Sequence, residues 1–453
     1  MVSCKALIAT AILVPAILLG YLFVTDSEPD VPVPETYRQN HYWGKKNWQV
    51  GETIPPDDQT VKPFQINIAE QVLLDLKSRL KNTRIQNSYP GLGFQYGMPS
   101  ETLNILIDHW LNKYDWRAEE KTLNQYKHFK TQIEGIDVHF VHVKPLKKAP
   151  ISAPLLIVHG WPGSFYEFYK MIPLLTEGPD INFELVIPSI PGFGFSEAPH
   201  RPGLHAYHVA RIFAKLMKRL GHEKFLYQGG DWGAAIGNAI SVTFPQRILG
   251  FHTNFPLFRL STRDYIKLAI ADYGYPSLVY DNPANETGLY SVSGYFKLVL
   301  KEAGYFHIQA TYPDTVGYGL NDSPAGLAAY ILEKFRDPLF APDAKLNQGL
   351  SMDEMLTNVM IYWINNCATS AARFYKEQIA VMFESYIIKV PFAADAGKYD
   401  IPTPPLSIIK RKATNIIHYR KAEIGGHFLA FEQPLLLAAA IREFALKVLQ
   451  DKQ

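Results

Sequence analysis

Short apolar runs alternate with segments of helical periodicity through the middle of the chain. Four runs are almost wholly apolar, as expected for parallel strands covered on both faces: 155–158, 183–188, 224–228 and 248–253. A helical pattern covers 206–220, between the second and third runs. This alternation of strands and helices predicts a doubly wound α/β sheet.

The alternation stops after residue 255. From 256 to about 380 the chain is helical in pattern and rich in tyrosine, without buried strands. Strand patterns return at Val390 and over 415–419, and a strongly patterned helix covers 434–448. The pattern therefore predicts an α/β core in two parts with an inserted helical lid: core 145–255, lid 256–385 and core 386–453.

The first 144 residues have a different character. Residues 6–24 are almost wholly apolar and lack a small-residue cleavage site, which favours an uncleaved membrane anchor over 1–25 rather than a signal peptide. Lys5 before the run favours a cytosolic N-terminus. Residues 26–144 begin Pro-rich and irregular and continue into helical periodicity, which predicts a segment that wraps the core.

Composition narrows the function classes. The 453 residues carry a formal net charge of +2 and show no basic stripe, so the sequence gives no sign of nucleic-acid binding. Two cysteines exclude a disulfide framework, and there is no CxxC or HExxH pattern for zinc. We expect no metal and no cofactor. Aromatic residues make up 13% of the chain, which fits apolar-lined pockets.

The chemistry centres on Asp231 in the pentapeptide 229–233. A buried strand precedes this Gly-Gly-Asp-Trp-Gly sequence and a small-residue helix follows it, which is the layout of a nucleophile elbow. A carboxylate in that position suits displacement at a saturated carbon, with an alkyl ester as the product that water must cleave. Epoxides and alkyl halides are the substrates that fit. The alternative is an ordinary turn aspartate between glycines.

An ester on Asp231 requires a base and an acid that orients it. In hydrolase-fold chains the acid and then the histidine follow the nucleophile. His427 fits the base, because Gly425 and Gly426 make a loop before it and a terminal helix follows. Asp400 is the first choice for the acid and Asp395, in the same loop, is the alternative.

The remaining roles fall to backbone amides and to phenols. The N–H groups of Trp161 and Trp232 are candidate donors to the oxyanion of ester hydrolysis, and the Trp161–Pro162 bond is a candidate cis peptide. A neutral tyrosine suits protonation of an epoxide oxygen. Tyr305 and Tyr375 are two candidates among 26 tyrosines, and the residue pattern alone does not select them.

Seven motifs spread from residue 42 to the C-terminal region resemble the microsomal epoxide hydrolase family, which includes the insect juvenile hormone epoxide hydrolases. They are Tyr42-Trp43-Gly44, Phe129-Lys130-Thr131, Val141-His142-Val143-Lys144-Pro145, His159-Gly160-Trp161-Pro162-Gly163-Ser164, Gly229–Gly233, Pro313-Asp314-Thr315-Val316-Gly317 and Gly425-Gly426-His427-Phe428. The resemblance implies an α/β-hydrolase fold with a helical lid, and a single-pass anchor in the endoplasmic reticulum membrane. It also implies a luminal N-terminus, opposite to the orientation that Lys5 favours.

Carried over onto the matching motifs, the resemblance makes Asp231 the nucleophile, His427 the base, and Tyr305 and Tyr375 the donors to the epoxide oxygen. The mammalian microsomal enzymes have Glu at the position matching Asp400, so the shorter Asp requires a closer approach to His427.

The resulting hypothesis is a membrane-bound epoxide hydrolase that uses water to convert lipophilic epoxides to vicinal diols. Two alternatives remain. A haloalkane dehalogenase shares the aspartate elbow but needs halide-binding indole or amide donors in place of a tyrosine pair. A non-catalytic carrier of hydrophobic ligands would bind without turnover.

Overall fold

The computed structural model describes residues 30–145, 147–286, 291–337, 344–346 and 349–450. The membrane anchor predicted over 1–25 lies outside these residues. Within the described part of the chain, no helix is both long enough and apolar enough to cross a bilayer.

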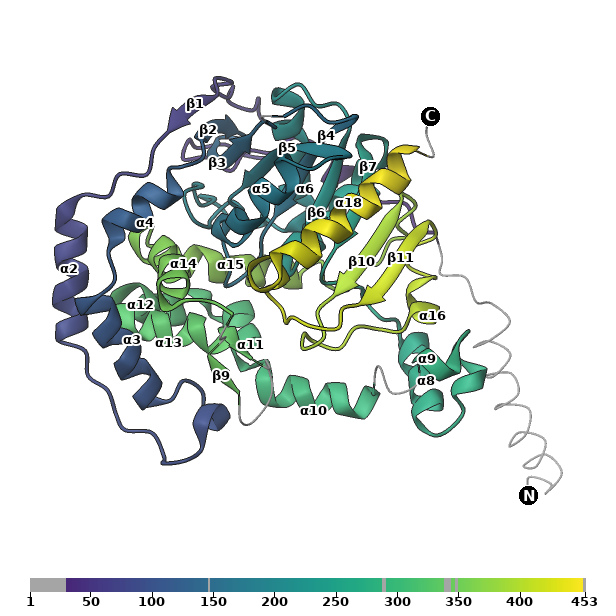
Figure 1. Ribbon diagram of the computed structural model, residues 1–453. Coiled ribbons are helices and arrows are strands. Elements are labelled where there is room, and N and C mark those ends of the chain that lie inside the picture. Colours follow the sequence, from purple (N-terminus) through teal and green to yellow (C-terminus); the bar gives the residue numbers. More distant parts are fainter. Residues whose placement is uncertain (1–29, 146, 287–290, 338–343, 347–348, 451–453) are drawn as a thin grey trace, which may run out of the picture.

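A nine-stranded sheet forms the centre of the molecule, in the order β1-β2-β3-β5-β4-β6-β7-β10-β11 (Figure 1). From β5 to β11 neighbouring strands are parallel, and β1, β2 and β3 extend the sheet antiparallel. The bounds are β1 Lys62–Phe64, β2 His128–Ile133, β3 Ile136–Val143, β4 Ile151–Val158, β5 Ile181–Pro188, β6 Phe225–Gly229, β7 Ile248–Thr253, β10 Phe392–Ala396 and β11 Ile416–Lys421. The four predicted apolar runs are the four central parallel strands β4, β5, β6 and β7.

Helices cover both faces of the sheet. A Cβ on Gly250 of β7 would meet the ring of Phe444 in α18 (Pro434–Gln450). The ring of the next strand residue, Phe251, lies against Gly237 of α7 (Trp232–Thr243) on the opposite face. α6 (Ala206–Arg219) packs beside α7, and α5 (Ile172–Thr176) beside α18. The doubly wound α/β arrangement predicted from the sequence is therefore present.

A helical insertion joins β7 to β10, as the loss of strand pattern predicted. Its helices are α8 Thr262–Asp272, α9 Pro283–Glu286, α10 Val292–Glu302, α11 Gly304–Thr311, α12 Pro313–Asp322, α13 Pro324–Leu332, α14 Met352–Ile364 and α15 Ala368–Ile379. The insertion also contains one short strand pair that was not expected, β8 (Arg336–Asp337) with β9 (Lys345–Leu346). Two residues per strand are too few to leave an alternating pattern in the sequence.

The segment before the core contributes α2 (Glu70–Lys81), α3 (Ser100–Asn112), α4 (Trp116–Leu123) and the edge strand β1. Near the beginning of this segment, Trp43 is hydrogen-bonded to Glu134, which lies in the turn between β2 and β3. The buried Glu134 carboxylate accepts from Trp43 Nε1 at 2.9 Å and from Arg211 Nε and Nη2 at 2.7 Å. Trp43 belongs to this segment and Arg211 to α6, so one carboxylate connects the segment to the core.

We expect Glu134→Ala to destabilise the protein by roughly 3–5 kcal/mol, because it leaves the Arg211 guanidinium buried without its counter-charge. The free energy of unfolding would be measured in urea. Glu35→Ala is the control in the same segment, since its pair with Arg38 is exposed and removal costs about 0–1 kcal/mol. Equal losses in the two variants would contradict a connecting role for Glu134.

Candidate active site

Asp231 stands at the carboxyl end of β6, immediately before α7. Its backbone has φ +49° and ψ −123°, a strained conformation for a residue with a Cβ. Strand and helix pass very close here: a Cβ on Gly233 would lie 2.1 Å from the carbonyl oxygen of Val158, and one on Gly229 would lie 2.6 Å from the Gly233 backbone. Small residues around the aspartate are therefore a packing requirement of the elbow, as the sequence predicted.

His427 lies between two carboxylates. Its Nδ1 is 2.8 Å from Asp400 Oδ1, and its Nε2 is 3.5 Å from Asp231 Oδ2. The backbone N–H of Ile401 also donates to Asp400 Oδ1, at 2.7 Å. The structure thus brings together the three residues that the sequence selected for nucleophile, base and acid.

Asp395, the alternative acid, points to other partners. Its Oδ2 lies 2.9 Å from His252 Nε2 and 2.6 Å from His418 Nε2, and its Oδ1 accepts from Arg420 at 2.7 Å. These partners come from β7 and β11, on either side of β10 in the sheet. The geometry therefore places Asp400, and not Asp395, against His427.

The electrostatics of His427 follow from these contacts. Burial alone lowers the pKa of an imidazole, but the charge of Asp400 and the hydrogen bond to Asp231 outweigh it and hold the pKa of His427 well above its usual value. These contacts favour an imidazolium between two carboxylates in the resting site. Loss of the Asp231 charge removes part of this stabilisation, so the pKa of His427 falls whenever Asp231 becomes an ester.

Of the two predicted amide donors, one is in place. The backbone N–H of Trp161 donates to Asp231 Oδ1 at 2.8 Å, and the Trp161–Pro162 bond is cis as expected. A Cβ on Gly160 would lie 2.2 Å from the same Oδ1, so only glycine lets the loop approach Asp231 this closely. The Trp232 amide opens α7 next to Asp231 without a corresponding contact among the described residues, and its donor role stays a prediction.

The two tyrosines of the insertion meet above Trp161. The Tyr305 ring, from α11, stacks on Trp161 with centroids 5.0 Å apart, and the Tyr375 ring, from α15, stands at 90° to it at 5.7 Å. Burial and the nearby Asp231 charge raise the pKa of Tyr305 far above 10, and burial does the same for Tyr375. The raised pKa values keep both phenols neutral near pH 7. No hydrogen bond of either hydroxyl is found within the described residues, and their role as donors to an epoxide oxygen stays a prediction.

Two carboxyl groups near His427 were not found from the sequence. Glu432, in α17 (Leu429–Glu432), accepts from the backbone N–H groups of Gly426 and Phe428 and so fixes the loop on both sides of His427. Glu167 packs over Gly163, where a Cβ would lie 2.2 Å from its Oε2. Neither residue belongs to a sequence motif that identifies a site. Glu432 acts by binding backbone N–H groups, and Glu167 acts through its charge and its burial.

Glu167 predicts a pH effect. Burial, together with the Asp231 charge, raises its pKa to about 8, so the group is neutral at pH 7 and becomes anionic above pH 8. The added negative charge opposes an oxyanion on Asp231 and holds the proton on His427 more tightly. We expect kcat to fall above about pH 8 in the natural protein and to stay level in Glu167→Gln, which mimics the neutral form. Profiles of kcat from pH 6.5 to 9.5 test this, and an unchanged fall in the variant would contradict it.

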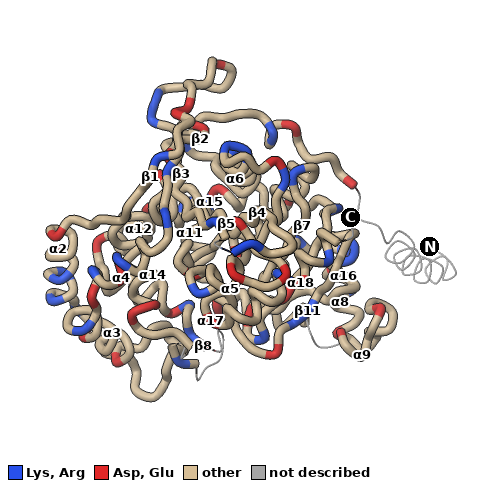
Figure 2. Tube along the Cα trace, turned by 45° about the horizontal axis from the view of Figure 1, so that its top comes forward, with Lys and Arg blue, Asp and Glu red and all other residues tan. Residues whose placement is uncertain are grey.

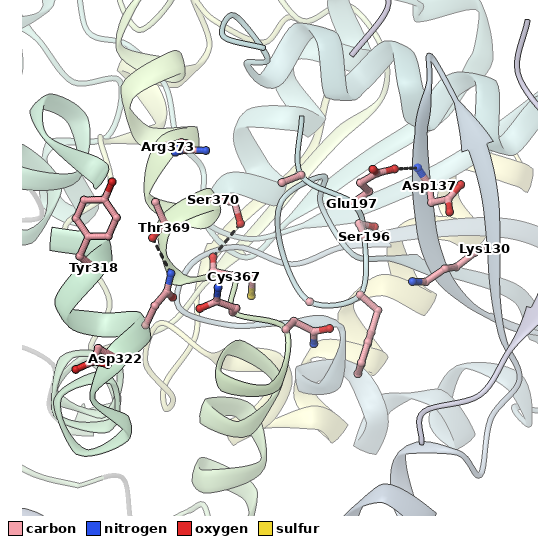
Figure 3. A pocket seen from close by; sticks show the side chains of 16 residues that line it. Lys130, Asp137, Ser196, Glu197, Tyr318, Asp322, Cys367, Thr369, Ser370 and Arg373 are labelled. Atoms are coloured by element: carbon pink, nitrogen blue, oxygen red, sulfur yellow. Dashed lines mark hydrogen bonds between the residues drawn. The ribbon is translucent and has the colours of Figure 1, made fainter. Parts of the chain in front are cut away.

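A cavity of about 1000 Å³ elsewhere contains none of these residues. It lies between the β2–β3 hairpin, the loop carrying Ser196 and Glu197, and helices α12 and α15 of the insertion (Figure 3). Its labelled lining is largely polar or charged, including Lys130, Asp137 and Arg373. The cavity is therefore separate from the Asp231 site.

Comparison with known proteins agrees with the fold. A family model described as "alpha/beta hydrolase fold" matches residues 153–270, and one described as "Epoxide hydrolase N terminus" matches residues 61–168. A solved structure of juvenile hormone epoxide hydrolase from the silkworm Bombyx mori superposes with a TM-score of 0.83 at 37% identity, covering 91% of this chain and 99% of that one. Aspergillus niger epoxide hydrolase gives 0.72 at 29% identity, covering 86% and 97%.

Curated relatives match over nearly the whole chain. Juvenile hormone epoxide hydrolase from Bombyx mori is 39% identical, covering 96% of each chain, and epoxide hydrolase 1 from Sus scrofa is 41% identical, covering 86% of this chain and 89% of its own. The fold and the aspartate elbow define an enzyme of the α/β-hydrolase class. Within that class, the chain belongs to the epoxide hydrolase family.

Proposed function

We propose that this epoxide hydrolase acts on lipophilic epoxides through a covalent ester on Asp231, with the insertion of 256–385 serving as a lid. The observation that carries the proposal is the geometry around Asp231. The Asp231 carboxylate at the elbow faces His427, which in turn contacts Asp400. Two neutral tyrosines, Tyr305 and Tyr375, extend from the insertion and contact the Trp161 ring. A halide-binding site would not need a phenol pair.

In the first step, an Asp231 oxygen attacks the less hindered epoxide carbon and the C–O bond of the ring breaks. The departing oxygen takes a proton from Tyr305 or Tyr375, giving a hydroxyalkyl ester and a tyrosinate. The proton on His427 restores the tyrosine, because esterification removes the Asp231 charge that held it there. His427 is then neutral, as the second step requires.

In the second step, neutral His427 takes a proton from water as the oxygen attacks the Asp231 carbonyl carbon. The Trp161 N–H donates to the oxyanion that forms, and Asp400 stabilises the imidazolium. Collapse of the tetrahedral intermediate breaks the ester C–O bond, and the departing diol oxygen takes the proton from His427. The proton left on the Asp231 carboxyl group then passes to His427, which restores the carboxylate and the imidazolium of the resting site. Epoxide and water are consumed and one diol is formed.

A single turnover in oxygen-18 water tests this route. Ester hydrolysis at the carboxyl carbon places the label in Asp231, and peptide mass spectrometry would detect it there while the diol stays unlabelled. Label in the diol with an unmarked Asp231 would mean direct attack by water and would overturn the ester mechanism.

Juvenile hormone and foreign lipophilic epoxides are both within the proposed substrate range. The relatives named juvenile hormone epoxide hydrolase and epoxide hydrolase 1 are about equally similar to this chain. The values of kcat/KM for juvenile hormone and for cis-stilbene oxide would rank the two substrates. A strong preference for cis-stilbene oxide would argue against a hormone-degrading role.

The proposed location is the endoplasmic reticulum membrane, with residues 6–24 as a single-pass anchor. The support is the length and apolar character of that run in the sequence. Lipophilic epoxides concentrate in membranes, so an anchored enzyme would meet its substrate there. Carbonate extraction of microsomes, which leaves spanning proteins in the pellet, tests the anchor.

A further inference from the structure

Helix α10 (Val292–Glu302) is apolar yet unburied. None of its residues is buried, although it contains Tyr295, Phe296, Leu298, Val299 and Leu300. Leu300 is 86% exposed and Phe296 is 53% exposed. A surface helix normally turns its apolar stripe to the protein core. The outward apolar residues of α10 are therefore expected to contact an apolar surface outside this chain.

The exposed face of α10 is organised as two parallel ridges. Phe296 and Leu300 lie four residues apart and form an apolar ridge, and Lys297 and Lys301 form a basic ridge directly beside it. The acidic residue of α10, Glu302, pairs with Arg336 through Oε2, and its Oε1 lies 3.3 Å from Lys301 Nζ, which leaves Lys297 as the lysine of the ridge without a carboxylate on α10. An apolar ridge bordered by lysines is typical of helices that lie in the interface of a bilayer with anionic headgroups.

The turn after α8, next to α10, also has large apolar and aromatic residues exposed to solvent. Tyr273, Tyr275 and Leu278 are exposed there, Tyr273 to 84%. α8 and α10 share a small apolar cluster that is separate from the main core, and both lie at one edge of the molecule (Figure 1). We call Tyr273, Tyr275, Leu278, Phe296 and Leu300 the α8–α10 surface.

The first described residue, Asp30, is connected through a few contacts to α8. Asp30 pairs with Lys389 at 2.5 Å. The neighbouring Ile388 donates its backbone N–H to the Lys412 carbonyl at 2.8 Å, and Lys412 Nζ lies 3.2 Å from Asp264 of α8. A short series of contacts thus connects the first described residue with α8. The anchor predicted over 1–25 ends five residues before Asp30, so a membrane holding that anchor would lie near this edge.

We propose that the α8–α10 surface rests on a lipid bilayer, with its apolar side chains at the headgroup–acyl boundary and Lys297 and Lys301 at lipid phosphates. Tyrosine suits this position because its ring is apolar and its hydroxyl is polar. Lysines at an anionic surface contribute roughly 1 kcal/mol each. Charges of both signs are interspersed over the described chain (Figure 2), so this small basic ridge acts together with the apolar one. The inference rests on the proposed membrane location.

The contact has a consequence for substrate access. α11, which carries Tyr305, begins two residues after α10 ends. In this proposal, a lipophilic epoxide at the α8–α10 surface lies next to the element that supplies a proposed proton donor. The α8–α10 surface would lower the KM for bilayer-dissolved substrates without changing the chemical steps.

Depth-dependent quenching tests the surface on the full chain. A Cys4→Ser background leaves the buried Cys367 unreactive, and Leu300→Cys carries an environment-sensitive fluorophore. Leu74→Cys on α2 is the matched control, an exposed leucine on a helix distant from α10 (Figure 1). In vesicles of phosphatidylcholine and phosphatidylserine, acyl-brominated lipid should quench the label at 300 severalfold more than the label at 74.

The outcomes separate the surface from the anchor. Protein that floats with the vesicles while the 300 label stays unquenched would overturn the surface alone. Protein that does not float would overturn both. A label at 300 whose emission shifts when the protein binds a second copy or another protein, without lipid quenching, would also overturn the bilayer proposal.

A functional variant adds a second measurement. In Phe296→Ser/Leu300→Ser we expect the KM for a vesicle-dissolved epoxide to rise severalfold, with kcat unchanged and with unchanged kinetics on a water-soluble epoxide. Equal loss on both substrates would indicate damage to the site and would count against the inference. Failure of turnover on every epoxide by the natural protein would instead contradict the proposed function.

Discussion

Replacing Asp231 by alanine is expected to lower kcat by about 10⁶-fold, the scale of loss when the nucleophile of a hydrolase triad is removed. The variant keeps His427, Asp400 and both tyrosines but has no group to form the ester. Water would have to attack the epoxide directly, without a base positioned for that path. Diol formation under substrate saturation measures the loss, and Asp322→Ala, an exposed carboxylate in α12, is the control. Activity within tenfold of the natural protein would refute covalent catalysis by Asp231.

A pair of variants at this position separates catalysis from strain. Asp231→Gly and Asp231→Ala both lack the carboxylate and differ only in the Cβ. Because φ is +49° and ψ is −123°, we expect the glycine variant to be more stable by about 1–3 kcal/mol, while both are inactive. Urea unfolding of the two proteins measures the difference. Equal stabilities would mean that the elbow relaxes when the aspartate is absent.

Much of the α/β core was predictable because its signals are local. The four central strands are largely buried, so each one left a mainly apolar run that could be recognised without knowledge of its neighbours. Asp231 was found the same way, since an elbow requires glycines at adjacent positions. His427 was identified by the two glycines before it. These features depend on residues a few positions apart.

The features that depend on distant contacts could not be derived from local pattern. Both aspartates were predicted to lie in one loop, but Asp395 lies in strand β10 and Asp400 in the loop after it; only the pairing of β10 with β7 and β11 gives Asp395 its own partners. Tyr305 and Tyr375 were selected by family resemblance, because no spacing distinguishes them from the other tyrosines. Their catalytic roles stay predictions.

Glu167 and Glu432 were missed for a related reason. A carboxyl that acts on its neighbours through burial and charge leaves no motif, because its effect depends on which side chains the fold brings around it. The edge of the sheet had the same limit: β1 was not predicted as a strand, and neither was its antiparallel pairing with β2.

His427→Gln is expected to block the second half of the reaction and leave the first. The attack of Asp231 on the epoxide needs no base, whereas cleavage of the ester needs one to take a proton from water. The variant should therefore convert one equivalent of epoxide and then stop, with steady-state turnover lowered by about 10⁴ to 10⁶-fold. Glutamine preserves much of the volume and can still donate to Asp400.

The ester that accumulates on Asp231 in this variant can be detected directly by its mass. After incubation with an epoxide and acid quenching, the peptide containing Asp231 should have gained the mass of one epoxide molecule. His200→Gln is the control, because His200 is a partly exposed residue paired with Glu197 outside the site and its loss should leave turnover intact. An inactive His427→Gln protein whose peptide is unmodified would mean that His427 is also required for ring opening. In that case the imidazolium between Asp231 and Asp400 supplies a proton directly to the epoxide oxygen, and the tyrosines serve only to hold it.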